Sequence, residues 1–187
     1  MIRSISKFIF FNLLGWKITG NVPKDKKIIA IVAPHTSWHD FFVGIFTRSI
    51  LRMESRIKFL GKNELFKKPL IGKILSQLGG YPVVRNKRMN SVDSVVKIFN
   101  NNESFFLALA PEGTRDKVDK LKTGFYYIAS KAKVPILLVG FCFKNRVVHF
   151  GEKFYPSGNI EEDMKKIISF FKNYQGKIPS NGLNHFA

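Results

Sequence analysis

The chain has 187 residues, a length that fits a single domain of ordinary size. Hydrophobic residues make up 45% of it, including 19 phenylalanines, which is enough to fill a core and excludes an intrinsically disordered chain. The formal net charge is +18, and a field of this sign attracts anionic lipid, an acidic carrier protein or nucleic acid. The one cysteine, Cys142, excludes an internal disulfide, and its apolar neighbours predict a buried structural thiol.

The first predicted element is an amphipathic helix over residues 2–16. No apolar run in the chain reaches the ~18 residues that a membrane-spanning helix needs. The helical positions that share one apolar stripe are Ile2, Ile5, Ile9 and Leu13, with Phe8 and Phe11 beside it and the cations Arg3, Lys7 and Lys17 nearby. We therefore interpret residues 1–20 as a helix lying in a membrane interface, with Trp16 at headgroup depth, ahead of a domain over residues 21–187. An ordinary packing helix is the alternative.

Strands and helices alternate along the rest of the chain. Strands are expected at residues 27–33, 57–60, 81–84, 104–109, 135–143 and 146–150, and helices at 38–52, 69–78, 91–101, 122–132 and 160–173. The run from Ile28 to Ala33 is apolar without alternation, which is typical of a strand buried on both faces. The helix at 38–52 is expected to turn Phe41, Phe42 and Ile45 inward. The pattern predicts an α/β fold with a mostly parallel sheet flanked by helices.

The segment after the first of these buried strands contains a candidate catalytic pair, His35 and Asp40. A histidine can take a proton from a hydroxyl, and a carboxylate can hold its ring in the useful tautomer. Five residues apart on one helix they would point about 140° apart, so we expect His35 in the loop and Asp40 in the first helical turn. A capping box with Ser37 as N-cap and Asp40 at N3 is the alternative. His35 and His39 alone are too few for a zinc site, so no metal is expected.

Two further segments offer groups that bind anions. After the strand at 104–109, Gly113 permits a turn with positive φ, and the Thr114 hydroxyl, the Arg115 guanidinium and the N–H groups of the turn can donate to a phosphate. Glu112 could position an arginine or a ligand hydroxyl there. A surface turn with an ion pair is the alternative. Arg85 follows the strand at 81–84, and its guanidinium can bind a phosphate with two N–H groups.

In their order and spacing these segments resemble the glycerolipid acyltransferase family, which is typified by 1-acylglycerol-3-phosphate acyltransferase. The resemblance rests on four blocks: His35 with Asp40, Gly79 with Arg85, Pro111 to Arg115, and the apolar segment that begins Val134-Pro135. It covers residues 27–140 approximately, and the first and third blocks are its most specific parts.

The resemblance implies transfer of a fatty-acyl group from acyl-CoA or acyl-carrier protein to a hydroxyl of a lysophospholipid-type acceptor, with no metal or other cofactor. His35 would be the general base and Asp40 would orient it. The residues that would hold the acceptor are Arg85, Glu112, Gly113, Thr114 and Arg115. The implied partners are an anionic membrane surface, the lyso-lipid and the acyl donor, and the implied location is peripheral, on the cytoplasmic face of the inner or plasma membrane. A nucleic-acid-binding module and an esterase or thioesterase with water as acceptor stay open as alternatives.

Overall fold

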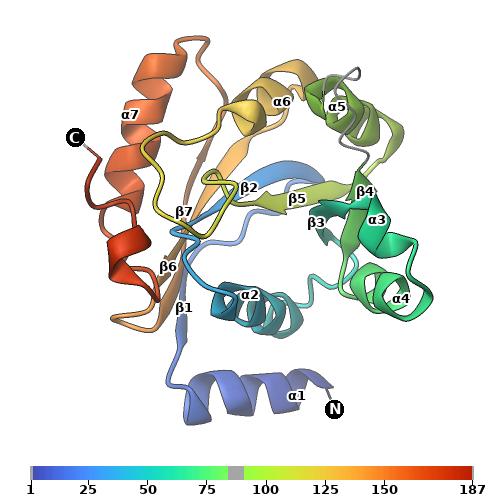
Figure 1. The fold of residues 1–187 in the computed structure, drawn as a ribbon, viewed down its shortest axis with the longest axis vertical. Helices are drawn as coiled ribbons and strands as arrows, with labels where there is room; N and C mark the ends of the chain where they lie inside the picture. The colour runs from blue at the N-terminus through green and yellow to red at the C-terminus, as the bar shows by residue number, and fades with distance from the viewer. Residues whose placement is uncertain (1, 84–90, 187) are drawn as a thin grey trace.

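A computed structural model describes residues 2–83 and 91–186 (Figure 1). In this described part of the chain, seven strands form one sheet in the order β1-β7-β6-β2-β5-β3-β4. The strands are β1 (Lys17–Gly20), β2 (Lys27–Ala33), β3 (Ile57–Lys62), β4 (Gly80–Val83), β5 (Phe105–Leu109), β6 (Ile136–Cys142) and β7 (Val147–Phe154). Neighbouring strands are parallel except β6 and β7, which are antiparallel. The predicted α/β fold with a mostly parallel sheet is confirmed.

Helices cover both faces of this sheet. The helical segments are α1 (Ile2–Lys7), the π-helix η1 (Phe8–Leu13), α2 (His39–Ile50), α3 (Asn63–Phe66), α4 (Pro69–Gln77), α5 (Ser91–Asn101), α6 (Gly124–Ala132), α7 (Ile160–Phe171) and the 3₁₀ helix η2 (Pro179–Asn181). Successive residues of β2 point to opposite faces, so Ile29 and Ile31 join one core with α5, α6 and α7, while Ile28 and Ala30 join a second core with η1 and α2. Figure 1 shows these two groups of helices on either side of the sheet.

The N-terminal segment packs on α2 through Arg3, Ser6 and Phe10. The Arg3 guanidinium donates to the Ile50 carbonyl over 3.0 Å, the Ser6 hydroxyl lies 3.2 Å from that of Ser49, and Phe10 is fully buried. The predicted depth of Trp16 is wrong, because Trp16 is only 6% exposed and stacks on Phe10. The single helix expected at 2–16 is also wrong in its extent, since η1 ends at Leu13 and β1 begins at Lys17.

Helix α2 differs from its prediction at one position that bears on the surface. Phe42, expected on the inner side, is 49% exposed, and Val43 is the buried residue beside it. Cys142 is buried, as predicted. Val84 and Arg85 lie outside the described residues, so the predicted role of Arg85 stays a prediction.

Candidate active site

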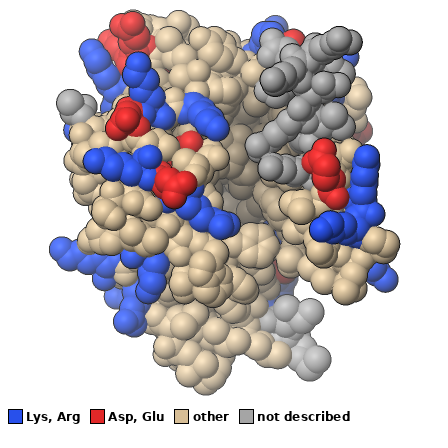
Figure 2. Space-filling model, in the orientation of Figure 1, with Lys and Arg blue, Asp and Glu red and all other residues tan. Residues whose placement is uncertain are grey.

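The two polar segments meet at one edge of the sheet. β2 and β5 are parallel neighbours, so the loop that follows β2 and the turn that follows β5 lie side by side at the carboxyl ends of both strands. A cavity of about 1240 Å³ opens there, and its lining includes His35, Asp40, Gly113, Thr114 and Arg115. The space-filling view in Figure 2 is hollowed near the centre of this face, with Lys and Arg side chains on both sides of the hollow. The cavity lining thus contains five of the seven residues predicted for the site, and a sixth, Glu112, contacts the His35 backbone.

His35 and Asp40 form the expected pair. Nδ1 of His35 lies 2.9 Å from Oδ2 of Asp40, and the Asp40 residue is 4% exposed. A carboxylate at this position makes Nδ1 the protonated ring nitrogen, which leaves the lone pair of Nε2 free. The His35 side chain is 27% exposed, so this nitrogen has access to the cavity. The arrangement suits abstraction of a proton from a bound hydroxyl.

The same Asp40 oxygen also holds the loop. Oδ2 accepts hydrogen bonds from the backbone N–H groups of Thr36 and Ser37, each over 2.9 Å. The bond to Ser37 is one half of the capping box that was the alternative interpretation. The other half is missing, since the Ser37 hydroxyl contacts His39 at Nδ1 over 2.8 Å and at the backbone N–H over 3.4 Å. In the described part of the chain Trp38 is the N-cap of α2 and its side chain makes no capping hydrogen bond, so this carboxylate oxygen holds the loop ahead of α2 and orients His35 at once.

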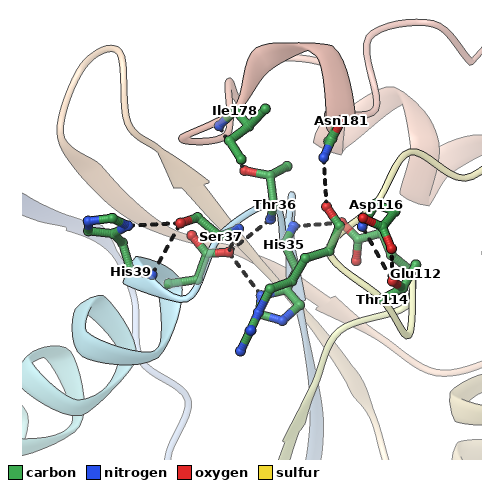
Figure 3. A network of polar contacts seen from close by, with 11 residues as sticks. His35, Thr36, Ser37, His39, Glu112, Thr114, Asp116, Ile178 and Asn181 are labelled. Carbon is green, nitrogen blue, oxygen red and sulfur yellow. Dashed lines mark hydrogen bonds and ion pairs between the residues drawn. The ribbon is translucent and has the colours of Figure 1, made fainter.

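Glu112 supports the His35 loop from the opposite side. Its Oε1 accepts the backbone N–H of His35 over 2.7 Å, and the residue is 2% exposed. Burial raises the pKa of this carboxyl group, an effect that the hydrogen bond from His35 reduces. Sequence reasoning placed Glu112 on the acceptor. In the structure Oε1 accepts the backbone N–H of His35 (Figure 3), and the role of Glu112 toward the acceptor stays a prediction.

The turn after Glu112 presents cations to the cavity. Gly113 has the predicted positive φ, at +68°, and a Cβ there would lie 2.6 Å from Nζ of Lys122. Lys122 therefore stands directly over the turn, and with Arg115 it lines the cavity. The Thr114 hydroxyl donates to Asp116 over 3.0 Å (Figure 3). Sequence reasoning missed Lys122, since nothing in its local pattern distinguishes it from the other lysines of this basic chain.

A C-terminal segment joins the two halves of the site. The Thr36 hydroxyl accepts the backbone N–H of Ile178 over 3.1 Å, and the Asn181 amide donates to the carbonyl of Arg115 over 3.0 Å. Figure 3 shows Ile178 and Asn181 reaching the His35 loop and the turn respectively. Thr36 is 1% exposed. The segment from Ile178 to Asn181 thus fixes the distance between the pair and the cations.

The comparison with protein families shows to which family the chain belongs. The family model described as "Acyltransferase" matches residues 16–141, more than half of the chain. The chain belongs to the acyltransferase family. The matched region contains the His35–Asp40 pair, the turn with Arg115, and Lys122. The C-terminal segment from Ile178 to Asn181 lies beyond it.

Relatives of this acyltransferase-family chain include proteins from bacteria and plants. It is 29% identical over 119 residues to "1-acyl-sn-glycerol-3-phosphate acyltransferase" of Bacillus subtilis. This alignment covers 63% of the chain and 56% of the relative. It is 33% identical over 146 residues to the chloroplastic "1-acyl-sn-glycerol-3-phosphate acyltransferase LPAT1" of Arabidopsis thaliana, covering 73% of the chain and 38% of the relative. A Streptococcus pneumoniae protein with the same acyltransferase name is 28% identical over 137 residues, covering 68% and 49%. The chain thus spans about half, or less, of the length of these relatives.

The remainder of the acyltransferase-family cavity is mostly apolar, and its lining also includes Arg48, whose guanidinium donates to the carbonyls of Gln77 and Leu78. Its lining includes Phe41 and Ile45 of α2 and Phe59 and Leu60 of β3, and the rings of Phe41 and Phe59 meet edge to face with centroids 5.8 Å apart. Leu65 and Leu78 line it near α3 and α4. Within residues 2–83 and 91–186, no group of three or more His, Cys, Asp or Glu side chains converges in a way that could hold a metal ion.

Proposed function

We propose that this protein is an acyltransferase that moves a fatty-acyl group from a thioester to a hydroxyl of a lysophospholipid. The observation that carries the proposal is the 2.9 Å contact between His35 and Asp40 at the wall of a cavity that has Arg115 and Lys122 beside the Gly113 turn and a mostly apolar lining elsewhere. The family match and the printed names of three relatives support the same chemistry.

The chemistry needs one base and no covalent enzyme intermediate. His35 Nε2 takes the proton of the acceptor hydroxyl as the hydroxyl oxygen attacks the thioester carbonyl carbon. The new C–O bond forms, the C–S bond breaks, and the thiolate leaves with the proton returned by the His35 imidazolium. Asp40 stabilises this imidazolium through Nδ1 and keeps the ring in place. Backbone N–H groups near the turn would stabilise the oxyanion of the intermediate. The donor is acyl-CoA or acyl-carrier protein, and no metal or other cofactor takes part.

The acceptor phosphate would bind at the cationic end of the cavity. Arg115 and Lys122 supply the charges, and the turn that contains Gly113 supplies backbone donors. In this proposal Thr114 and Arg85 belong to the same site. The relatives are named for 1-acyl-sn-glycerol-3-phosphate, and we propose this lyso-lipid or one that shares its phosphate as the acceptor.

The lipid acceptor would be met at the membrane surface. Packing of Ser6 and Phe10 on α2 leaves the apolar side chains Ile5, Phe8 and Leu13 between 52% and 64% exposed. A groove of about 670 Å³ beside them has Lys144, Arg146 and Lys177 in its lining. Exposed apolar groups next to cations suit an anionic interface. The described helices include none with the length and apolarity needed to cross a bilayer. We propose peripheral attachment to the cytoplasmic leaflet through α1 and η1.

The test compares His35→Ala with His149→Ala, a matched histidine on β7. Thiol release from acyl-CoA and from acyl-carrier protein is measured with lysophosphatidate and other lyso-lipids, and mass spectrometry identifies the acylated product. We expect His35→Ala to lose about 10²–10⁴-fold in rate while His149→Ala stays near wild type, because only His35 serves as the base. Circular dichroism checks that both variants are folded. A folded His35→Ala protein with the wild-type rate would contradict the proposal. Free fatty acid with no acylated lipid would indicate water as the acceptor.

A further inference from the structure

Helix α4 exposes an apolar ridge on the surface of the protein. Leu70, Ile71 and Ile74 are 73%, 43% and 47% exposed, although this helix is only nine residues long. On the preceding helix α3, Leu65 is 40% exposed. Single exposed apolar side chains are ordinary, but several adjacent ones mark a surface that binds something apolar.

The ridge results from the way α4 is fixed to the rest of the molecule. Gly72 is buried, and a Cβ at this position would collide with the carbonyl group of Phe66, so α4 packs on α3 through the side that carries Gly72. At ~100° per residue, Leu70 and Ile74 project about 160° away from Gly72 on the helix. The Arg48 guanidinium holds the far end of the helix by donating to the carbonyls of Gln77 and Leu78. Leu70 and Ile74 are therefore held outward by a rigid attachment.

Cations border the ridge. Lys67, Lys68 and Lys73 are all exposed, and Lys73 lies within α4 itself. Lysine stems can extend along apolar surface while their amines remain among charged groups. This combination of protruding aliphatic side chains and flanking lysines is the pattern of a helix that inserts shallowly into an anionic lipid surface.

The position of α4 relates the ridge to the cavity and to α1. Both helices attach to the carboxyl-terminal half of α2, α1 through Ile50 and the end of α4 through Arg48, and Figure 1 shows α1 and α4 beside α2. Leu65 and Leu78, which flank α4 in the chain, line the apolar part of the cavity. Leu65 is also 40% exposed, so the cavity reaches the surface beside α4, and we call this opening the apolar mouth of the cavity. A bilayer in contact with α4 would therefore lie at this mouth.

We infer that α4 is a second bilayer-binding element, separate from α1, which inserts Leu70 and Ile74 into an anionic lipid surface and holds the apolar mouth of the cavity against it. The inference rests on the proposed function in one respect, the delivery of a lipid acceptor. The lipid-binding part is independent of catalysis.

The experiment measures binding of the full chain to vesicles by sedimentation. The probes are phosphatidylcholine vesicles with and without phosphatidylglycerol. The variant Leu70→Ser/Ile74→Ser is compared with Tyr155→Ser, a matched control whose tyrosine is 61% exposed in the loop after β7. We expect the double variant to bind the anionic vesicles about tenfold or more weakly than wild type, since two large aliphatic groups no longer enter the lipid. Tyr155→Ser should bind as wild type does.

A spectroscopic probe gives a positive signal that does not depend on loss of binding. Leu70→Cys is labelled with an environment-sensitive fluorophore, the native Cys142 being buried, and Tyr155→Cys is labelled as the control. We expect a blue shift on anionic vesicles for the label at position 70 and none at position 155. Vesicle binding of Leu70→Ser/Ile74→Ser equal to wild type, or no shift at position 70, would overturn the inference. The inference would also be overturned if, without lipid, Leu70→Ser/Ile74→Ser sedimented more slowly than wild type. That result would assign the ridge to contact with a second copy of the chain.

Activity separates this inference from the proposed function. On lyso-lipid dispersed below its micelle concentration, Leu70→Ser/Ile74→Ser should keep the wild-type rate, because neither residue lines the cavity. On lyso-lipid embedded in anionic vesicles its rate should fall about as much as its binding. Absence of acyl transfer by the wild type in both formats would reject the proposed function and leave the vesicle-binding result unaffected.

Discussion

Two buried carboxyl groups, those of Asp40 and Glu112, fix the His35 loop from opposite sides. Oδ2 of Asp40 has three donors, two backbone N–H groups and the His35 ring. Oε1 of Glu112 accepts the backbone N–H of His35, and within the described residues neither Oε2 of Glu112 nor Oδ1 of Asp40 has a hydrogen-bond partner. At Glu112 burial outweighs the hydrogen bond from His35 and raises the pKa of the carboxyl group.

The raised pKa of Glu112 predicts a pH dependence of stability. The folded protein holds the Glu112 proton more tightly than the unfolded chain, which loses it near the ordinary value of 4.5. The stabilising contribution is therefore complete below pH 4.5 and is lost as the pH rises through the folded-state pKa. We expect Glu112→Gln, which keeps an oxygen for the His35 N–H, to remove this loss. Urea unfolding measured at intervals above pH 4.5 should give a flatter dependence for the variant than for wild type.

The control for this measurement is Glu103→Gln, at an exposed glutamate before β5. Its stability curve should run parallel to that of wild type at every pH. If the curves of Glu112→Gln and wild type were also parallel, the Glu112 carboxyl group would have the same pKa in the folded and unfolded states, and burial would not control it.

At the scale of elements, the sequence predicted what depends on local pattern. Buried strands such as β2 and β6 appear as apolar runs, and α5 occupies its predicted residues 91–101. Edge strand β1 was missed because its four residues form no apolar run, and its place depends on pairing with the distant β7. The contacts of Ile178 and Asn181 with the site were missed for the same reason, since they join residues 142 and 66 positions apart. Local patterns therefore predicted the His35–Asp40 pair, and only the fold reveals the contacts of Ile178 and Asn181 with the segments around it.

The start of α7 offers a prediction about one such long-range contact. Asp163 is 2% exposed and accepts hydrogen bonds from the Ser157 backbone and hydroxyl and from the Tyr126 hydroxyl. Burial alone would raise the pKa of Asp163, but these hydrogen bonds outweigh it and hold the pKa below 3.8. Asp163→Asn should lower the free energy of unfolding by about 1–3 kcal/mol at neutral pH.

The pH dependence identifies the cause of that loss. A depressed acid pKa stabilises the folded state above the unfolded value of 3.8, and this contribution is lost as the pH falls through the folded-state pKa. The stability difference between wild type and Asp163→Asn should therefore narrow as the pH is lowered below 3.8. Glu161→Gln, in the same helical turn but exposed, is the control and should cost little. If the difference in free energy of unfolding between wild type and Asp163→Asn stayed constant with pH, the charge of Asp163 would not be the cause of the lower stability of the variant.

At the scale of the whole molecule, the structure shows where part of the positive charge lies on the surface. The sequence shows a net charge of +18, which does not distinguish lipid from nucleic acid. The structure locates part of this charge beside exposed apolar groups, at Lys67, Lys68 and Lys73 around α4 and at Lys144 and Arg146 near η1. Figure 2 shows Lys and Arg side chains on both sides of the hollow. Cations that alternate with large exposed aliphatic side chains match the chemistry of a lipid surface better than that of a phosphate backbone.

This placement predicts how salt acts on membrane binding. Each basic residue near an anionic surface contributes about 1 kcal/mol, and the screening length shortens from ~10 Å at 0.1 M to ~3 Å at 1 M salt. Binding to phosphatidylglycerol-containing vesicles should therefore weaken steeply as salt is added, whereas binding to phosphatidylcholine alone should change little. Lys67→Gln/Lys73→Gln should flatten the salt dependence. Lys165→Gln/Lys166→Gln, an equal change of charge on exposed residues of α7, should leave it as in wild type. Equal flattening by both pairs would show that the net charge of the protein, and not its location around α4, attracts it to the membrane.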